Sequence, residues 1–160
     1  MTPEDSKDIT IEVVWNKVDD AIAQEIIDYW QDAGLGSVPP ERAQQVVVIA
    51  RNQESKIAGI STSQLQLIPS LQNKMYVFRA SLHPKYRIPG LLEYIIVSSI
   101  EHLEATYKEN DPDCIGVFAK VENAQLKKHR TIKARTGLNF IGFASNGDPV
   151  RAHFFRGAKY

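Results

Sequence analysis

The sequence predicts a mixed α/β (α+β) fold with a single, largely antiparallel sheet of about seven strands and helices on both of its faces. Runs of alternating or β-branched residues indicate the strands, and stretches of helical periodicity separate some of them. Their order is strand, helix, three strands, helix, strand, helix and two strands. Because strands alternate with helices only in part, the sheet should be mixed and sandwiched between helices.

The composition is typical of one globular domain. The chain has 160 residues, of which 43% are hydrophobic and 24% charged. Nineteen basic residues balance 19 acidic ones, so the net charge does not predict wholesale binding of nucleic acid or membranes. We expect residues 1–8 to form a loose tail and residues 9–160 to form a single domain.

The sequence contains no apolar run of the roughly 18 residues that a membrane-spanning helix requires. The N-terminus is polar and acidic and lacks the basic start and apolar core of a signal peptide. The single cysteine, Cys114, rules out an internal disulfide, and a buried structural thiol is the favoured interpretation. These features predict a cytoplasmic protein without membrane contact.

The first strand is predicted over residues 9–15, and a helix should follow it. Apolar side chains recur at helical spacing from Val18 to Ala33, and polar ones occupy the other face. Asn16 can cap the start of this helix, and Gly34 with Gly36 can end it. Three strands come next, at residues 45–51, 57–68 and 74–82, and the first two of them should form a hairpin.

The second half of the chain begins with a helix after the loop at 83–89. Six residues are expected to form its inner stripe: Leu92, Ile95, Ile96, Ser99, Leu103 and Tyr107. A strand at 114–121 and a basic helix at 124–136 follow. Strands at 139–144 and 150–155 flank Asn146-Gly147, which is a strong hairpin signal.

The segment between the strand at 74–82 and the helix after it has the chemistry of an anion site. The first amides of a helix lack partners inside the helix and point outward with the positive end of its dipole. Arg87 adds a fixed charge with several donors, and Gly90 lets a ligand approach the backbone. The alternative is an ordinary surface turn before a helix.

The residues from Leu82 to Leu92 follow the pattern L-x-P-x-Y-R-x-x-G-L-L. This pattern resembles the pyrophosphate loop of the GNAT family of N-acetyltransferases, and the predicted element order also resembles that family. A looser similarity lies further on, where Asn123 follows a strand and Gly137-Leu138 precedes the last hairpin. The resemblance covers most of the chain.

The resemblance implies that the protein binds acetyl-CoA or another acyl-CoA and transfers the acyl group to a primary amine by direct attack. The diphosphate would lie on the amides of the loop, and the pantetheine arm would run beside the strand at 74–82. The thioester would lie where that strand splays from the strand at 114–121. The implied cofactor-binding residues are Leu82, Arg87, Ile88, Pro89, Gly90, Leu91, Leu92 and Asn123.

Two residues are candidates for the general base. Glu122 ends a strand near the expected thioester, and His83 lies at the mouth of the loop. A solvated strand end and a polar loop residue are the alternatives for these two positions. His129 is a further candidate for the acid that protonates the thiolate, since Lys133 stands where many family members place a tyrosine.

Two residues within the loop depart from the family pattern. Pro89 removes one backbone donor, although proline suits the first turn of a helix. Leu92 replaces a small residue, and its bulk is expected to crowd the diphosphate. We therefore expect weaker CoA binding than in a typical member. The alternative function is a catalytically degenerate binding or regulatory module.

The remaining candidates predict few other partners. The four histidines show no metal-ligand spacing, so we expect no metal. A basic cluster runs from Lys127 to Arg135 and is either a solvated helix face, a contact for the 3′-phosphate of CoA or a nucleic-acid contact. Without interleaved aromatic residues, nucleic acid ranks last. The acceptor would be a small-molecule or peptide amine, and a homodimer is left open.

Overall fold

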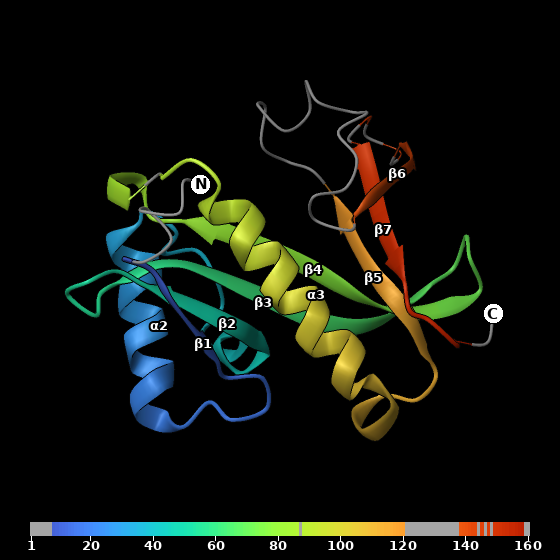
Figure 1. The fold of residues 1–160 in the computed structure, drawn as a ribbon, viewed down its shortest axis with the longest axis horizontal. Helices are drawn as coiled ribbons and strands as arrows, with labels where there is room; N and C mark the ends of the chain where they lie inside the picture. The colour runs from blue at the N-terminus through green and yellow to red at the C-terminus, as the bar shows by residue number, and fades with distance from the viewer. Residues whose placement is uncertain are drawn as a thin grey trace. The chain divides into compact units, whose positions relative to one another are not determined.

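The computed structural model describes residues 8–86, 88–120, 138–143, 145, 147 and 149–158, without the side chain of Lys120. It contains a seven-stranded sheet with the strand order β1-β2-β3-β4-β5-β7-β6 (Figure 1). This sheet and its accompanying helices confirm the predicted fold class. The chain divides into two compact units, one of Met1–Ser63 with Ala80–Ser99 and one of Gln64–Arg79 with Ile100–Tyr160.

The elements follow one another nearly as predicted. The strands are β1 (Thr10–Val13), β2 (Val46–Arg51), β3 (Ile57–Ile68), β4 (Asn73–Leu82), β5 (Cys114–Lys120), β6 (Asn139–Phe143) and β7 (Pro149–Phe154). The helices are α2 (Asp20–Asp32) and α3 (Leu91–Asn110), with short 3-10 turns η1 (Pro40–Gln45) and η2 (Pro84–Tyr86). The basic helix expected at 124–136 lies outside the described residues.

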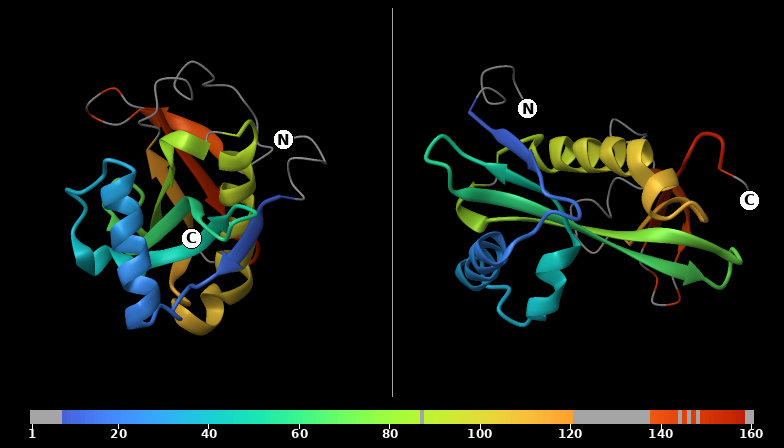
Figure 2. Two further views of the ribbon diagram at one scale, coloured as in Figure 1. Left: turned by 90° about the vertical axis from the view of Figure 1, so that its left-hand side faces the viewer. Right: turned by 90° about the horizontal axis from the view of Figure 1, so that it is seen from below.

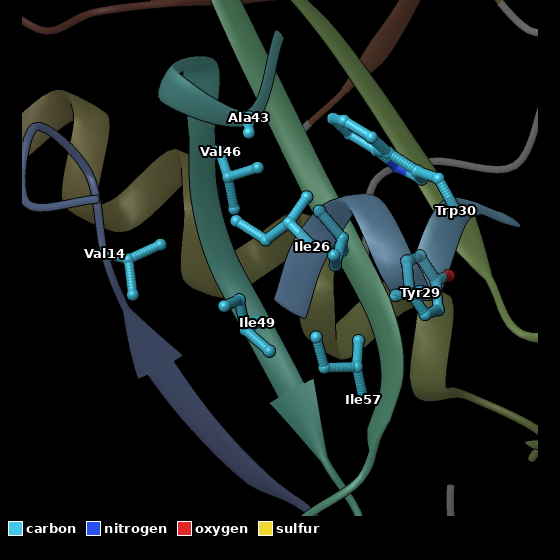
Figure 3. Close-up of a cluster of buried hydrophobic side chains, with 9 residues drawn as sticks. Val14, Ile26, Tyr29, Trp30, Ala43, Val46, Ile49 and Ile57 are labelled. Carbon is cyan, nitrogen blue, oxygen red and sulfur yellow. The ribbon is translucent and has the colours of Figure 1, made fainter. Parts of the chain in front are cut away.

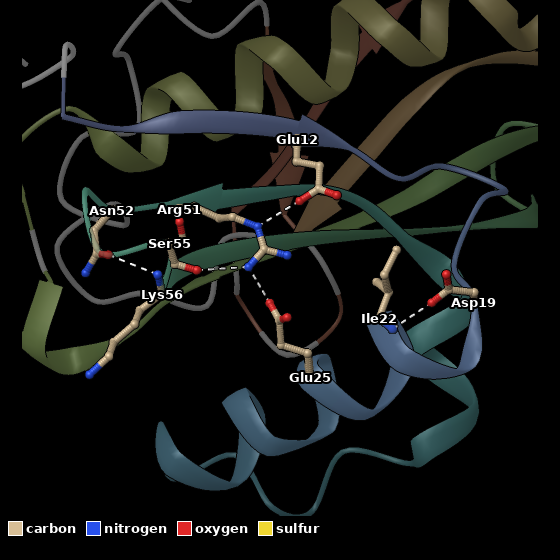
Figure 4. Close-up of polar contacts among 8 residues, drawn as sticks. All are labelled: Glu12, Asp19, Ile22, Glu25, Arg51, Asn52, Ser55 and Lys56. Carbon is tan, nitrogen blue, oxygen red and sulfur yellow. Dashed lines mark hydrogen bonds and ion pairs between the residues drawn. The ribbon is translucent and has the colours of Figure 1, made fainter.

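Helix α2 begins later than the sequence predicted. Its N-cap is Asp19, whose carboxylate accepts a hydrogen bond from the Ile22 amide at 2.8 Å, and the prediction of Asn16 as the cap is wrong (Figure 4). Asn16 instead has a φ of 60° in the turn after β1. The end was predicted correctly, because Gly34 has a φ of 82° and donates its amide to the Gln31 carbonyl, as in a Schellman cap.

In the first unit, α2 packs on one face of β2 and β3. Ile26, Tyr29 and Trp30 of the helix meet Val46 and Ile49 of β2 in a buried apolar cluster (Figure 3). Burying each such side chain contributes about 1.5–3 kcal/mol, so this cluster is the main reason that α2 lies on the sheet. Its apolar stripe fits the helical period that the sequence displays.

The opposite face of the same strands carries the first part of α3 (Figure 2). Gly59 of β3 allows the close approach: a Cβ at this position would lie 2.6 Å from Ile95 Cδ1 and 3.0 Å from the Ser81 carbonyl oxygen. Two residues further along β3, the buried hydroxyls of Ser61 and of Ser99 on α3 are 2.7 Å apart. The predicted placement of helices on both faces is therefore confirmed in this unit.

Arg51 joins three segments at the end of β2. Its guanidinium donates to Glu12 of β1, to Glu25 of α2 and to the Ser55 carbonyl in the turn before β3 (Figure 4). The guanidinium is mostly shielded and both carboxylates are nearly half exposed, so solvent screens these ion pairs. We interpret Arg51 as a structural anchor.

In the second unit, β5 pairs with β4 in parallel and with β7 in antiparallel orientation. The described β4–β5 pairing runs from Lys74–Cys114 to Val77–Phe118. The strands β6 and β7 form the predicted terminal hairpin. The second half of α3 contributes the Glu104 carboxylate, which lies 2.9 Å from His153 Nε2 of β7.

The inner stripe of α3 includes Leu91 and Ile100, which the prediction left out. Leu91 is fully buried, whereas Leu92 is only partly buried. Ile95, Ser99 and Leu103 are buried as expected. Among the described residues, no helix combines the length and apolar character that a membrane crossing needs.

The close approach at Gly59 yields a testable expectation. Gly59→Ala should destabilise the protein by about 1–3 kcal/mol, because its Cβ would overlap Ile95 and a backbone oxygen. Gly36→Ala is a matched control, since nothing lies within 4 Å of a Cβ there. Urea denaturation measures both variants, and equal midpoints for the two would contradict the packing described here.

Candidate functional site

The candidate site lies where β4 ends and α3 begins, entirely within the first unit. After Leu82, the last residue of β4, the chain turns through η2 and reaches α3 at Leu91. The amide of His83 still donates to the Ala58 carbonyl of β3 at 2.8 Å, so the loop starts from a fixed point on the sheet. The predicted strand, loop and helix start are therefore present.

The loop is a continuous series of tight turns. The Tyr86 amide donates to the His83 carbonyl, and the Ile88 amide donates to the Tyr86 carbonyl, both at 2.9 Å. The Leu91 amide then donates to the Ile88 carbonyl at 3.1 Å, and the first helical bond runs from Tyr94 to Gly90. Each turn fixes the position of the next, from the sheet to the helix.

Gly90 provides the conformation that joins the loop to the helix. Its φ is 82°, a value that costs roughly 1–2 kcal/mol for residues with a side chain. The residue directly precedes the first turn of α3, where the helix amides point out of the helix. Gly90 thus has a backbone conformation that glycine adopts more readily than any other residue, and its role in phosphate binding stays a prediction.

The internal turns determine which amides a ligand could use. Ile88 and Leu91 already donate to carbonyls of the loop, and Pro89 has no amide hydrogen. In the part of the chain that the structure describes, Gly90, Leu92 and Glu93 have no such backbone partner. Fewer of the described backbone amides are therefore available to a ligand than the family resemblance implies. The positive end of the helix dipole still lies at this position.

The structure describes most of the predicted cofactor-binding residues and leaves some out. Leu82, Ile88, Pro89, Gly90, Leu91 and Leu92 lie together at the end of β4 and the start of α3. Arg87, Asn123 and the candidate base Glu122 lie outside the described residues, as do His129, Lys133 and the rest of the basic cluster.

His83, the other candidate base, is only 3% exposed. Its Nε2 lies 2.7 Å from Asp32 Oδ2, and its Nδ1 accepts a hydrogen bond from the Lys85 amide at 3.1 Å. Because Nδ1 accepts this bond, the ring N–H is on Nε2, which donates a hydrogen bond to Asp32. Both ring nitrogens are occupied, so proton abstraction from an acceptor would require one of these bonds to break.

Sequence reasoning missed two residues of this site. Asp32 ends α2, and the hydrogen bond from His83 lowers the pKa of its carboxyl group, with nearby Lys85 and Lys56 adding to the effect. Tyr29, one turn earlier, places its hydroxyl 3.2 Å from the Ser81 hydroxyl of β4. The only signal in the sequence was an acidic residue at a helix C-terminus, where the dipole disfavours negative charge.

Burial raises the pKa of the Tyr29 hydroxyl, and its contact with Ser81 opposes this effect only partly. Tyr29 therefore stays protonated at neutral pH. Among the described residues, no group of three or more His, Cys, Asp or Glu side chains could hold a metal ion.

The fold is that of the acyl-CoA N-acyltransferases of the GNAT family. An acetyltransferase of the GNAT family from Streptococcus pneumoniae is 13% identical, with a TM-score of 0.63 over 92% of this chain and 99% of that one. NAA60 from Arabidopsis thaliana in complex with acetyl-CoA is 14% identical, with a TM-score of 0.58 over 92% and 98% of the two chains.

An aminoglycoside acetyltransferase in complex with coenzyme A and kanamycin is 12% identical, with a TM-score of 0.57 over 91% of this chain and 94% of that one. No protein-family model matches the sequence, and no curated protein matches it either. The likeness at this level of identity concerns the fold, and the predicted resemblance in fold is confirmed.

Cys114 gives a direct test of the burial described for β5. Its side chain is buried, and burial raises the pKa of its thiol to about 11. At pH 8 roughly one thiol in a thousand is then ionised. We expect iodoacetamide to leave the native protein unmodified at pH 8 and to alkylate Cys114 in denaturant, as read by mass spectrometry. Rapid alkylation of the native protein would contradict this.

Proposed function

We propose that the protein is an N-acyltransferase that uses acyl-CoA, in the first place acetyl-CoA, and acylates a primary amine. The observation that carries the proposal is the junction of β4 and α3, where Gly90 has a φ of 82° before an open helix N-terminus. In this proposal the diphosphate of CoA binds the amides of Gly90, Leu92 and Glu93, and Arg87 supplies the countercharge.

The reaction would be a direct transfer. The amine nitrogen attacks the thioester carbonyl carbon, the C–S bond breaks, and the products are an amide and CoA. The amine must lose a proton and the departing thiolate must gain one, for which Glu122 and His83 stay the candidate residues. An amide near Ala80 to Leu82 would polarise the carbonyl.

The pantetheine arm would lie along the last residues of β4. In the described part of the chain the pairing of β4 with β5 covers Lys74 to Val77, and β4 continues beyond it to Leu82. That arrangement supports a role for its backbone groups in binding the arm. The acceptor would be a small-molecule or peptide amine. Kanamycin in the aminoglycoside acetyltransferase complex is one amine-bearing compound to include in a panel.

A second candidate function has its own support. The amides of Ile88 and Leu91 are occupied by internal turns and Pro89 has no amide hydrogen, so few of the described residues of the loop have a free backbone donor. This favours a module that binds acyl-CoA weakly, or not at all, and has a regulatory rather than a catalytic role. The two functions differ in turnover and share the same site.

Thermal denaturation with CoA tests the site. Ligand at a hundredfold excess over its Kd should stabilise the protein by about 2.7 kcal/mol. Arg87→Glu should abolish this stabilisation, because it places a negative charge beside the diphosphate. Lys17→Glu, the same charge reversal at an exposed position after β1, should retain it. Absence of any stabilisation at millimolar CoA would sink the acyltransferase proposal and would leave only a module that does not bind acyl-CoA.

Turnover separates the two candidates. Incubation with acetyl-CoA and a panel of amines, including kanamycin and peptides with free N-termini, should release free CoA thiol only when a suitable amine is present. The release is followed with a thiol-reactive dye and the acylated product by mass spectrometry. CoA binding without any acylated product across the panel would favour the regulatory module.

A further inference from the structure

Asp32 occupies an unfavourable position for a carboxylate. It is the last residue of α2, where the helix dipole is negative, and the last turn of the helix holds no basic residue. Its side chain is 70% exposed and could turn to water, yet it lies 2.7 Å from His83 Nε2. The hydrogen bond to His83 therefore offsets a placement that the helix itself disfavours.

His83 uses every polar atom that it has. Its backbone amide donates to Ala58 of β3, and its carbonyl accepts from Tyr86. Its ring accepts from the Lys85 amide through Nδ1 and donates to Asp32 through Nε2. The bond from Lys85 spans two residues in the manner of an Asx-turn, so the ring itself shapes the start of the loop.

Two aromatic rings hold the imidazole in place. The ring centroid of Tyr29 lies 5.9 Å from that of His83, and the ring centroid of Tyr86 lies 5.3 Å from it. Tyr29 is in turn fixed by its contact with Ser81 of β4. His83 therefore has one defined orientation, set by α2 on one side and by the loop on the other.

The position of the first amides of α3 depends on the orientation of His83. The turns from His83 to Tyr86, from Tyr86 to Ile88 and from Ile88 to Leu91 share residues, so each amide is placed relative to the one before. The Gly90 and Leu92 amides come at the end of this series. A change in the His83 ring would alter the direction in which those amides point.

We propose that Asp32 and His83 are positioning residues for the CoA diphosphate, and that the hydrogen bond between them couples the end of α2 to the geometry of the loop. This inference rests on the proposed function, because it requires that CoA binds the loop. In this role neither residue contacts the diphosphate itself. Asp32 lies 51 positions from His83 in the chain and belongs to no part of the loop pattern.

The first experiment needs no ligand. Asp32→Ala removes the acceptor for Nε2, and amide hydrogen exchange at Tyr86, Ile88 and Leu91 should become at least severalfold faster. Asp28→Ala is the matched control: Asp28 lies one turn earlier on α2, and its carboxylate accepts a bond from Gln24 of the same helix. Equal exchange in the two variants would overturn the coupling, whatever the protein binds.

The second experiment measures the consequence for CoA by titration calorimetry well below the unfolding temperature. Asp32→Ala should weaken CoA binding about fivefold, less than a buried charged hydrogen bond would, since Asp32 is largely exposed. Asp28→Ala should bind as the parent protein does. An unchanged Kd together with a lowered unfolding temperature would mean a purely structural role and would overturn the inference.

Two substitutions of His83 test its hydrogen bonds to Lys85 and to Asp32 separately. His83→Asn can still accept from the Lys85 amide but cannot reach Asp32, whereas His83→Gln can reach Asp32 but offers no equivalent acceptor to Lys85. In His83→Asn, a further Asp32→Ala change should have no additional effect on exchange at Leu91. An additive effect would show that Asp32 acts independently of His83.

A parent protein that binds no CoA would sink the proposed function, while the exchange results would still decide whether Asp32 and His83 are coupled to the loop.

Discussion

The close approach of α3 to β3 at Gly59 is the constraint on which the rest of the site depends. With no Cβ at this position, Ile95 of α3 and the Ser81 carbonyl of β4 both occupy the space beside β3. The start of α3 is thereby held next to the end of β4, and the loop between them must close within a few residues. The apolar cluster under α2 covers the other face of the same strands and keeps β3 in place.

That closure explains the character of the loop. In a short connection from a strand to a helix, the backbone amides either donate hydrogen bonds to carbonyls of the loop or remain available to a ligand. Both kinds of amide occur in the described part of this loop. Ile88 and Leu91 donate to the loop itself, whereas the amides of Gly90 and Leu92 have no backbone partner among the residues that the structure describes. The fold thus places the N-terminus of α3 directly after the loop, and among the described residues Ile88 and Leu91 direct their amides to carbonyls of the loop.

The fold alone does not decide the activity, because one architecture hosts many functions that differ in a few side chains. In this chain, a buried histidine of the loop is held by a carboxylate at the end of α2. Asp32 and His83 connect α2 to the loop through a single hydrogen bond, and the aromatic rings of Tyr29 and Tyr86 limit the imidazole to one orientation. Such a contact can tune ligand affinity without touching the ligand.

The sequence by itself determined the order of strands and helices, the hairpins and the loop with its glycine, because periodicity, turn residues and glycine act over a few neighbouring positions. It misjudged Asn16, since a cap is chosen by where the chain turns after β1. It also placed Leu92 rather than Leu91 on the inner stripe, since the exact rotation of a helix is set by what it packs against. Only the tertiary structure brought Asp32 to His83, because a contact across 51 residues depends on how α2 lies on the sheet and leaves no periodic signal.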